Sequence, residues 1–149
     1  MSLSRVSVTA VRNLHPVTFS PSPRINILHG ANGSGKTSVL DAFALASWGK
    51  SFLSNRAFDI VKSGTPGLMV KAELQELTDL KSTIRVRKKG GETAISLDGQ
   101  AIHAASVLAQ RLPLIAINSK AADILTENPS NRRALIDRTM FPVEPTYIA

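Results

Sequence analysis

The chain has 149 residues, a length typical of one domain with its own core, and it contains no cysteine, which excludes disulfides, thiolate metal sites and cysteine nucleophiles. Its formal net charge of +7 favours polyanionic partners, although a solvated positive surface would explain the charge equally well. The longest uninterrupted apolar run, residues 112–117, is too short to span a bilayer, and the N-terminus lacks a signal-peptide core, so we expect a cytoplasmic protein without membrane contact.

The N-terminal part predicts three short strands. Residues 4–11 alternate between apolar and polar side chains, and the alternation ends at Arg12 and Asn13. Residues 14–19 fit the return strand of a hairpin, which a proline-rich stretch then ends. Residues 24–29 alternate and then run apolar, which is typical of a strand entering a buried sheet.

An octet directly after this third strand fills every position of the phosphate-binding pattern G-x-x-x-x-G-K-[ST]. Its members are Gly30, Ala31, Asn32, Gly33, Ser34, Gly35, Lys36 and Thr37. The glycines allow the backbone to curl, so that several N–H groups point at one anion. Lys36 would supply a charge for the β- and γ-phosphates, and the Thr37 hydroxyl is placed to ligate Mg²⁺. We therefore expect ATP with Mg²⁺ to bind here, through the octet and Ser38.

After the octet, the sequence predicts a helix, then a long connection, and then three strands. Residues 38–48 contain no Gly or Pro and are apolar around most of their circumference, which predicts a helix packed on more than one side. Residues 49–66 are typical of a long connection, with a short helix around 55–61. Three strand-like runs follow and predict a second antiparallel sheet: residues 67–77, 82–88 and 93–97.

The C-terminal third predicts two helices and one more strand. Residues 104–112 fit a short helix, and residues 113–117 are apolar on both faces, as a central strand of a core sheet would be. Asn128 is a good N-cap, and a helix should run from there to about residue 139. These elements together indicate an α/β fold.

A complete phosphate-loop ATPase also needs a second metal-side acid and a signature loop, and neither is found in this sequence. Asp98 follows an apolar run but lies on a glycine turn, and residues 63–67 have a proline where a signature loop would need flexibility. We therefore assign no catalytic residue. The rest of the catalytic site is expected on residues outside this chain or on another protein.

Three stretches carry a resemblance to a known family: residues 11–14, 30–42 and 128–137. On these residues the chain resembles the N-terminal part of the RecF family, DNA replication and repair ATPases related to the SMC proteins. The resemblance implies a P-loop NTPase fold, in which residues 1–149 form the N-terminal ATP-binding lobe of an ABC/SMC-like head. Such a lobe combines a mixed core sheet with an antiparallel β subdomain, and its signature and Walker B half would lie elsewhere.

The resemblance also implies function. A RecF-like head binds ATP and Mg²⁺, dimerises with nucleotide between its subunits, and binds gapped DNA or single-/double-strand junctions without sequence preference. Proteins of this kind act with RecO and RecR and are tied to the SOS response. Arg12 and Asn13 would flank the nucleotide. Candidate DNA contacts lie beside a glycine turn and on the last helix: Arg85, Arg87, Lys88, Lys89, Arg132 and Arg133.

Plainer interpretations stay open for several of these residues. Arg12 and Asn13 fit a strand-end turn, and the basic run at 85–89 fits an edge strand whose charges prevent self-association. Arg132 and Arg133 fit a solvated helix face. Two other function classes compete with a DNA repair ATPase. One is a small phosphate-loop kinase, for which no Arg-rich lid is found, and the other is a nucleotide-binding switch that does not act on DNA.

Overall fold

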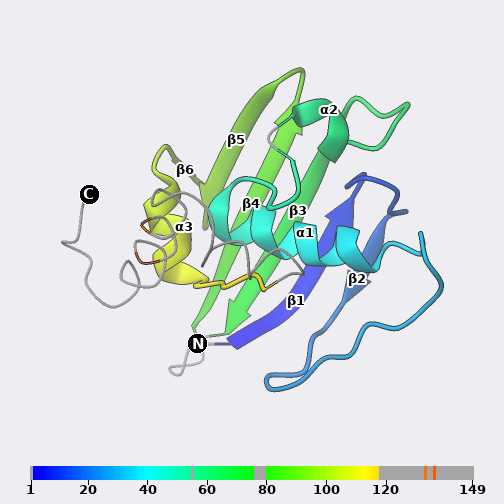
Figure 1. Ribbon diagram of the computed structural model, residues 1–149. Helices are drawn as coiled ribbons and strands as arrows, with labels where there is room; N and C mark the ends of the chain where they lie inside the picture. The colour runs from blue at the N-terminus through cyan, green and yellow to red at the C-terminus, as the bar shows by residue number, and fades with distance from the viewer. Residues whose placement is uncertain (1, 55, 76–79, 118–132, 134–135, 137–149) are drawn as a thin grey trace.

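The computed structural model describes residues 2–54, 56–75, 80–117, 133 and 136. Six antiparallel strands form one sheet in the order β2-β1-β3-β4-β5-β6. The strands are β1 (Ser2–Thr9), β2 (Val17–Phe19), β3 (Gly67–Gln75), β4 (Lys81–Lys89), β5 (Glu92–Leu97) and β6 (Gln100–Ile102). The helices are α1 (Lys36–Trp48), α2 (Ala57–Ile60) and α3 (Ala105–Arg111). Figure 1 shows α1 and α3 on one face of the sheet.

The core lies between this covered face and α1. Strand side chains alternate between the two faces, so every second residue of β1, β3 and β4 points toward the helices. The buried residues of these strands include Val6, Val8, Leu68, Val70, Ala72, Leu74, Ile84 and Val86. From α1, Ala42, Leu45 and Ala46 pack into the same cluster. The apolar half of each alternating pattern therefore forms the core, as the period of two predicts.

The strands predicted at 67–77, 82–88 and 93–97 are confirmed as β3, β4 and β5, but the expectation of a second antiparallel sheet is wrong. β3 pairs with β1 from Ser2↔Gln75 to Thr9↔Met69. A strand has a hydrogen-bonding edge on each side, and β1 uses one edge for β2 and the other for β3. Both groups of strands therefore merge into one sheet. β6 follows the turn at Asp98 and was not predicted.

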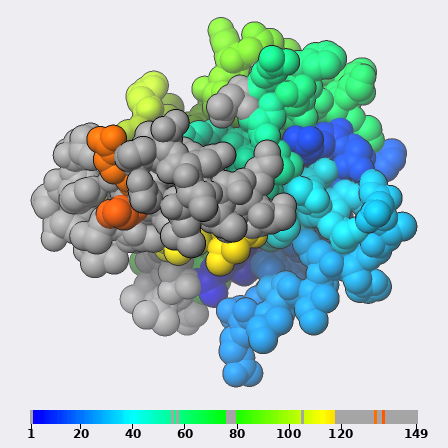
Figure 2. Space-filling view, in the orientation of Figure 1, coloured from blue at the N-terminus to red at the C-terminus, as the bar shows by residue number. Residues whose placement is uncertain are grey.

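Two segments predicted as core strands are not strands in the structure: residues 24–29 and 113–117. The isoleucine side chains of both segments are exposed, at 77% for Ile25, 82% for Ile27, 58% for Ile115 and 84% for Ile117. Within the described residues, no strand lies beside either segment to receive its backbone hydrogen bonds. The connection that contains residues 24–29, light blue in Figure 2, protrudes at the edge of the molecule. The parallel part of the expected mixed sheet is thus not seen in the described part of the chain.

The predicted helices agree better with the structure. α1 and α3 confirm the helices expected at 38–48 and 104–112, and α2 lies inside the window expected at 55–61. The helix predicted at 128–139 lies mostly outside the described residues, although Arg133 and Ile136 are both helical. Of the helices that the structure describes, none has the length and apolar character needed to cross a membrane.

Candidate nucleotide site

The phosphate-binding loop, residues 30–35, leads directly into α1. Gly33 and Gly35 have φ angles of +80° and +96°, in the left-handed region that favours glycine. A Cβ atom on Gly35 would lie 2.6 Å from Leu14 Cδ2, whereas a Cβ atom on Gly33 would meet nothing within 4 Å. The curl of the loop therefore requires glycine at both positions, and Gly35 has a second, steric requirement.

Lys36 is the first residue of α1, and its side chain turns back over the loop. Its Nζ donates to the carbonyl oxygens of Gly30 and Ala31, both at 2.8 Å. The first N–H groups of a helix have no acceptor within that helix, and the helix dipole adds a partial positive charge at this end. The ammonium group and the helix N-terminus together form a site suited to a phosphate anion.

The turn after β1, residues 12–14, braces this loop from the side. Asn13 Nδ2 donates to the Gly33 carbonyl at 2.6 Å, and Ser38 Oγ donates to Asn13 Oδ1 at 2.7 Å. Leu14 is buried and faces Gly35. One amide side chain thus joins the loop to the first turn of α1. Asn13 therefore positions the loop, and the nucleotide contact expected from the sequence stays a prediction.

Arg12 lies at the start of the same turn in an unusual backbone conformation. Its φ angle is +52°, in a region that non-glycine residues rarely adopt. The conformation is held by a hydrogen bond from its N–H to the Ile60 carbonyl at 2.7 Å and by a β-bridge between Val11 and Val61. The connection after α1 therefore fixes the backbone of Arg12 next to the phosphate loop.

Asp41 in α1 faces the Arg12 side chain. Arg12 Nη1 lies 3.8 Å from Asp41 Oδ2, and the two side chains are 31% and 0% exposed. The carboxylate also accepts from Ser51 Oγ at 2.7 Å and from the Phe52 N–H at 3.1 Å. Asp41 was not predicted as a site residue. The signal that could have revealed it is that Asp41 is the only charged residue within the apolar helix pattern of residues 38–48.

Metal ligands are few around the loop. Thr37 is exposed in the first turn of α1, next to Lys36. No group of three or more His, Cys, Asp or Glu side chains that could hold a metal occurs among the described residues. Asp98 is engaged elsewhere, because its carboxylate accepts from Ser82 Oγ at 2.9 Å and from the Thr83 N–H at 2.6 Å. Mg²⁺ at the loop would therefore depend on Thr37 together with phosphate and water oxygens.

The basic run at 85–89 lies along β4 and ends at the glycine turn that joins β4 to β5, where Lys89 pairs with Glu92. Arg85, Arg87 and Lys89 are exposed on the face that the helices leave uncovered. Lys88 points to the other face, donates to Thr93 Oγ1 at 2.8 Å, and has its pKa lowered by burial. β4 has neighbours on both sides, so the edge-strand interpretation is wrong. Of the second candidate pair, Arg133 is exposed and Arg132 lies outside the described residues.

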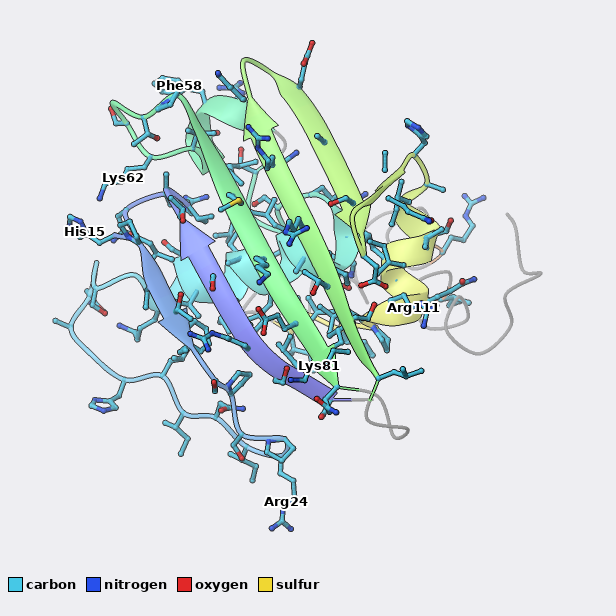
Figure 3. The ribbon with its side chains drawn as sticks, turned by 180° about the vertical axis from the view of Figure 1, so that it is seen from behind. His15, Arg24, Phe58, Lys62, Lys81 and Arg111 are labelled. Carbon is cyan, nitrogen blue, oxygen red and sulfur yellow. The ribbon has the colours of Figure 1, made fainter. Side chains whose placement is uncertain are left out.

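More basic side chains share the uncovered face, which Figure 3 views directly with the helices behind the strands. Residues that alternate with the buried positions of β1, β3 and β4 point to it. We call the following set the basic face: Arg5, Lys71, Lys81, Arg85, Arg87 and Lys89. The register places Lys71 opposite Arg85. Sequence reasoning missed Arg5, Lys71 and Lys81 because their common surface depends on the strand order.

A family profile matches most of this chain, and two sequence relatives carry the same name. A family profile described as an AAA domain matches residues 5–133. The protein named "DNA replication and repair protein RecF" of Pseudomonas fluorescens (strain SBW25) is 49% identical over 150 residues, covering 100% of this chain and 41% of that relative. The protein of the same name in Pseudomonas aeruginosa (strain LESB58) is 46% identical and is covered to 40%. The chain therefore spans about two fifths of the length of these curated relatives.

Solved structures agree with the expected fold class. The structure "Structure of the recombination mediator protein RecF-ATP in RecFOR pathway" matches with a TM-score of 0.87 at 22% identity, over 98% of this chain and 39% of that chain. The structure "Structural biochemistry of ATP-driven dimerization and DNA stimulated activation of SMC ATPases" matches with a TM-score of 0.72 at 19% identity, over 93% of this chain and 99% of that chain. The chain therefore belongs to the AAA domain family and has the fold of the RecF and SMC ATPase heads.

Proposed function

We propose that this protein is the ATP-binding lobe, residues 1–149, of a RecF-like DNA repair ATPase. The observation that carries the proposal is the braced phosphate loop. Gly33 and Gly35 shape it with positive φ angles, Lys36 covers it, and Asn13 joins it to α1. A preorganised loop of this kind binds phosphate without first having to be ordered. The fold supports the nucleotide assignment, because a solved neighbour is named as RecF with ATP.

The residues proposed to hold the nucleotide form one continuous segment, and Arg12 lies beside it in the turn after β1. The phosphate oxygens would be bound by Gly30, Ala31, Asn32, Gly33, Ser34, Gly35, Lys36, Thr37 and Ser38. Thr37 would ligate Mg²⁺, and Arg12 would add a positive charge from the side. Bound ATP would supply the interaction energy for joining two lobes, in the way that the name of the SMC neighbour describes as ATP-driven dimerization.

The basic face supports DNA as the second partner. Like charges directly opposite each other on a sheet are destabilising, yet Lys71 lies opposite Arg85, and Glu73 pairs only with Lys71 of the two. A polyanion on this face would relieve the repulsion. The face offers no recognition helix, so we expect binding to the phosphate backbone, without sequence preference and with strong salt dependence. The names of the relatives favour DNA over other polyanions.

We further propose that the lobe works in the cytoplasm within an ATP-dependent homodimer, on gapped DNA or DNA junctions, and with RecO and RecR. Turnover would also need a second metal-side acid and a signature loop, and the sequence offers neither. The purified chain should therefore bind ATP and hydrolyse it poorly. A steady-state rate near about 1 s⁻¹, within the usual range for enzymes, that disappears in Lys36→Ala would contradict this expectation.

Calorimetric titration of ATP with Mg²⁺ into the wild type and Lys36→Ala tests the nucleotide assignment. Loss of a charge-assisted contact to phosphate should weaken binding by roughly 10- to 150-fold. Lys50→Ala is the matched control, since Lys50 is an exposed lysine just beyond the other end of α1. Equal affinities for the wild type and Lys36→Ala would refute the proposal.

A further inference from the structure

Asp41 is a buried acid in a helix that otherwise packs through apolar residues. It is 0% exposed, and its hydrogen-bond donors are one hydroxyl group, Ser51 Oγ, and one backbone group, the Phe52 N–H. Neither donor carries a charge. A carboxylate out of contact with water requires a compensating cation or becomes costly. The nearest cation among the described residues is Arg12, at 3.8 Å.

Arg12, in turn, has a nitrogen atom without a hydrogen-bond partner in the described part of the chain. Its Nη1 atom is buried and has no hydrogen-bond partner among the residues that the structure describes. The guanidinium carries five N–H donors in a rigid plane and cannot lose its proton, so its charge also has to be balanced. The Asp41 carboxylate faces it at a distance that provides Coulomb attraction without a short hydrogen bond. Each group is therefore the main electrostatic partner of the other.

The position of this pair relates it to the phosphate loop. Asp41 lies one helical turn beyond Thr37 on α1. Arg12 precedes Asn13, whose amide bonds both to the Gly33 carbonyl and to Ser38. The Arg12 backbone is held in its left-handed conformation by the bond to Ile60. The guanidinium thus lies against the carboxylate of the helix that begins at the phosphate loop, with 31% of the side chain still accessible.

We propose that Asp41 is a positioning residue for nucleotide binding, which holds the Arg12 guanidinium beside the phosphate loop before ATP arrives. The loose contact leaves the guanidinium able to bond to a polyphosphate, while the carboxylate prevents the long side chain from sampling other rotamers. The ordering of Arg12 is then already complete when the anion binds. This inference rests on the proposed function, namely that ATP binds at this loop.

The proposal predicts a change in ATP affinity, on neutralising Asp41, that is opposite to the change expected from simple electrostatics. Removing a negative charge near a polyanion site should, by Coulomb attraction alone, strengthen ATP binding. If Asp41 acts by holding Arg12, its neutralisation should weaken ATP binding instead. The weakening should also disappear when Arg12 is absent, because no side chain then remains to be positioned.

Asp41→Asn, Arg12→Gln and the double variant, titrated calorimetrically with ATP and Mg²⁺, separate these cases. We expect Asp41→Asn to weaken ATP binding about tenfold, the scale of one charge-assisted contact. In the Arg12→Gln background the same substitution should change the affinity less than about twofold. Unchanged or stronger binding by Asp41→Asn, or equal weakening in both backgrounds, would overturn the proposal.

Two controls complete the test. Asp59→Asn makes the same chemical change at an exposed acid of α2, whose carboxylate accepts from Ser54 Oγ at 2.6 Å, and it should leave ATP affinity unchanged. Lys36→Ala separates the two proposals, since an unchanged affinity there would refute nucleotide binding at the loop itself. A loss in Lys36→Ala without a loss in Asp41→Asn would refute only the role of Asp41.

A measurement on the unaltered protein keeps the proposal testable if the variants do not fold. In the nucleotide-free protein, rotation of the Arg12 guanidinium should be slow on the NMR timescale, because the carboxylate holds it. Resolved Arg12 Nη resonances would support the proposal. Rapid averaging of those resonances, comparable to that of the exposed Arg24, would overturn it.

Discussion

The two faces of the sheet differ in what determines their function. On β4, Ile84 is completely buried on the covered face, and its neighbour Arg85 is exposed on the basic face. The covered side supports a site held by specific hydrogen bonds, such as those of the Asn13 amide between the phosphate loop and α1. The basic face carries several similar charges with few defined partners. Geometry should therefore control nucleotide binding, and the number of charges should control binding of a polyanion.

The largest effect should come from the covered face itself. Ile84→Ala removes a fully buried side chain from the core and should lower the free energy of unfolding by about 2–5 kcal/mol. Arg85→Ala, one residue along the same strand, should change it by no more than about 0.5 kcal/mol. Chemical denaturation of both variants measures the difference. Similar losses for the two variants would show that the faces are not energetically distinct.

The next effect should distinguish two glycines of the phosphate loop. Gly33→Ala places a side chain at a positive φ with open space around it, which should cost about 1–3 kcal/mol of strain. Gly35→Ala adds a collision with Leu14 and should therefore cost more than Gly33→Ala. Thermal unfolding and ATP titration of both variants check the order of the two effects.

A double-mutant cycle isolates the collision at Gly35. If Leu14 Cδ2 is the obstacle, Leu14→Ala combined with Gly35→Ala should be less destabilising than the sum of the single variants, by about 1–3 kcal/mol. Additive losses would mean that the backbone angle alone makes Gly35 necessary. The shape of the phosphate loop would then depend on the backbone torsion angle at Gly35 and not on its packing against Leu14.

The basic face should respond to the number of charges. Arg85→Glu with Arg87→Glu should reduce the slope of log affinity for gapped DNA against log salt by about 2, because each phosphate contact contributes roughly one unit. ATP binding should not change. Fluorescence anisotropy over a salt series gives the slope.

The matched control is Arg24→Glu with Lys50→Glu, the same change in net charge at two exposed residues outside the basic face. Figure 3 shows Arg24 on the protruding connection after β2. Equal slopes for the two double variants would mean that net charge, and not this face, governs DNA binding. Unchanged DNA binding in both would favour a nucleotide switch that does not act on DNA.

The sequence predicted best what depends on neighbours along the chain. The phosphate loop and α1 follow from a contiguous motif and an uninterrupted helical pattern, and both are present in the structure. The alternation expected at residues 4–11 is likewise present in β1, where Val6 and Val8 are buried and Arg5 is exposed. Local patterns determine which side chains share a face of one element, and these predictions needed nothing more.

Apart from β6, which pairs with β5 across the turn at Asp98, the misses involve partners far apart in the sequence. Residues 24–29 and 113–117 have the composition of buried strands, but a strand forms only where another strand bonds to it, which composition does not report. The pair of Arg12 and Asp41 and the union of the six strands in one sheet depend on the three-dimensional arrangement. Only an unexplained charge in an apolar helix pointed to Asp41 in advance.

The smallest effect concerns Glu73, an acid on the same side of the sheet as the basic face. Its pKa is lowered from the usual 4.5, first by a hydrogen bond from Lys71, against an opposing effect of burial, and further by the charges of Lys71, Arg5 and Lys81. Because the folded-state pKa lies below the unfolded value, Glu73 stabilises the fold above pH 4.5, and this contribution is lost as the pH falls through the folded-state value. The pair is partly exposed, so the contribution should not exceed about 1 kcal/mol.

Unfolding of the wild type and Glu73→Gln at pH 7 and at pH 3 should therefore show a stability difference that shrinks in acid, whereas the exposed Glu92→Gln should differ little from the wild type at either pH. An equal difference at both pH values would mean that Lys71 does not hold the carboxylate, and the basic face would then behave as a set of independent charges throughout.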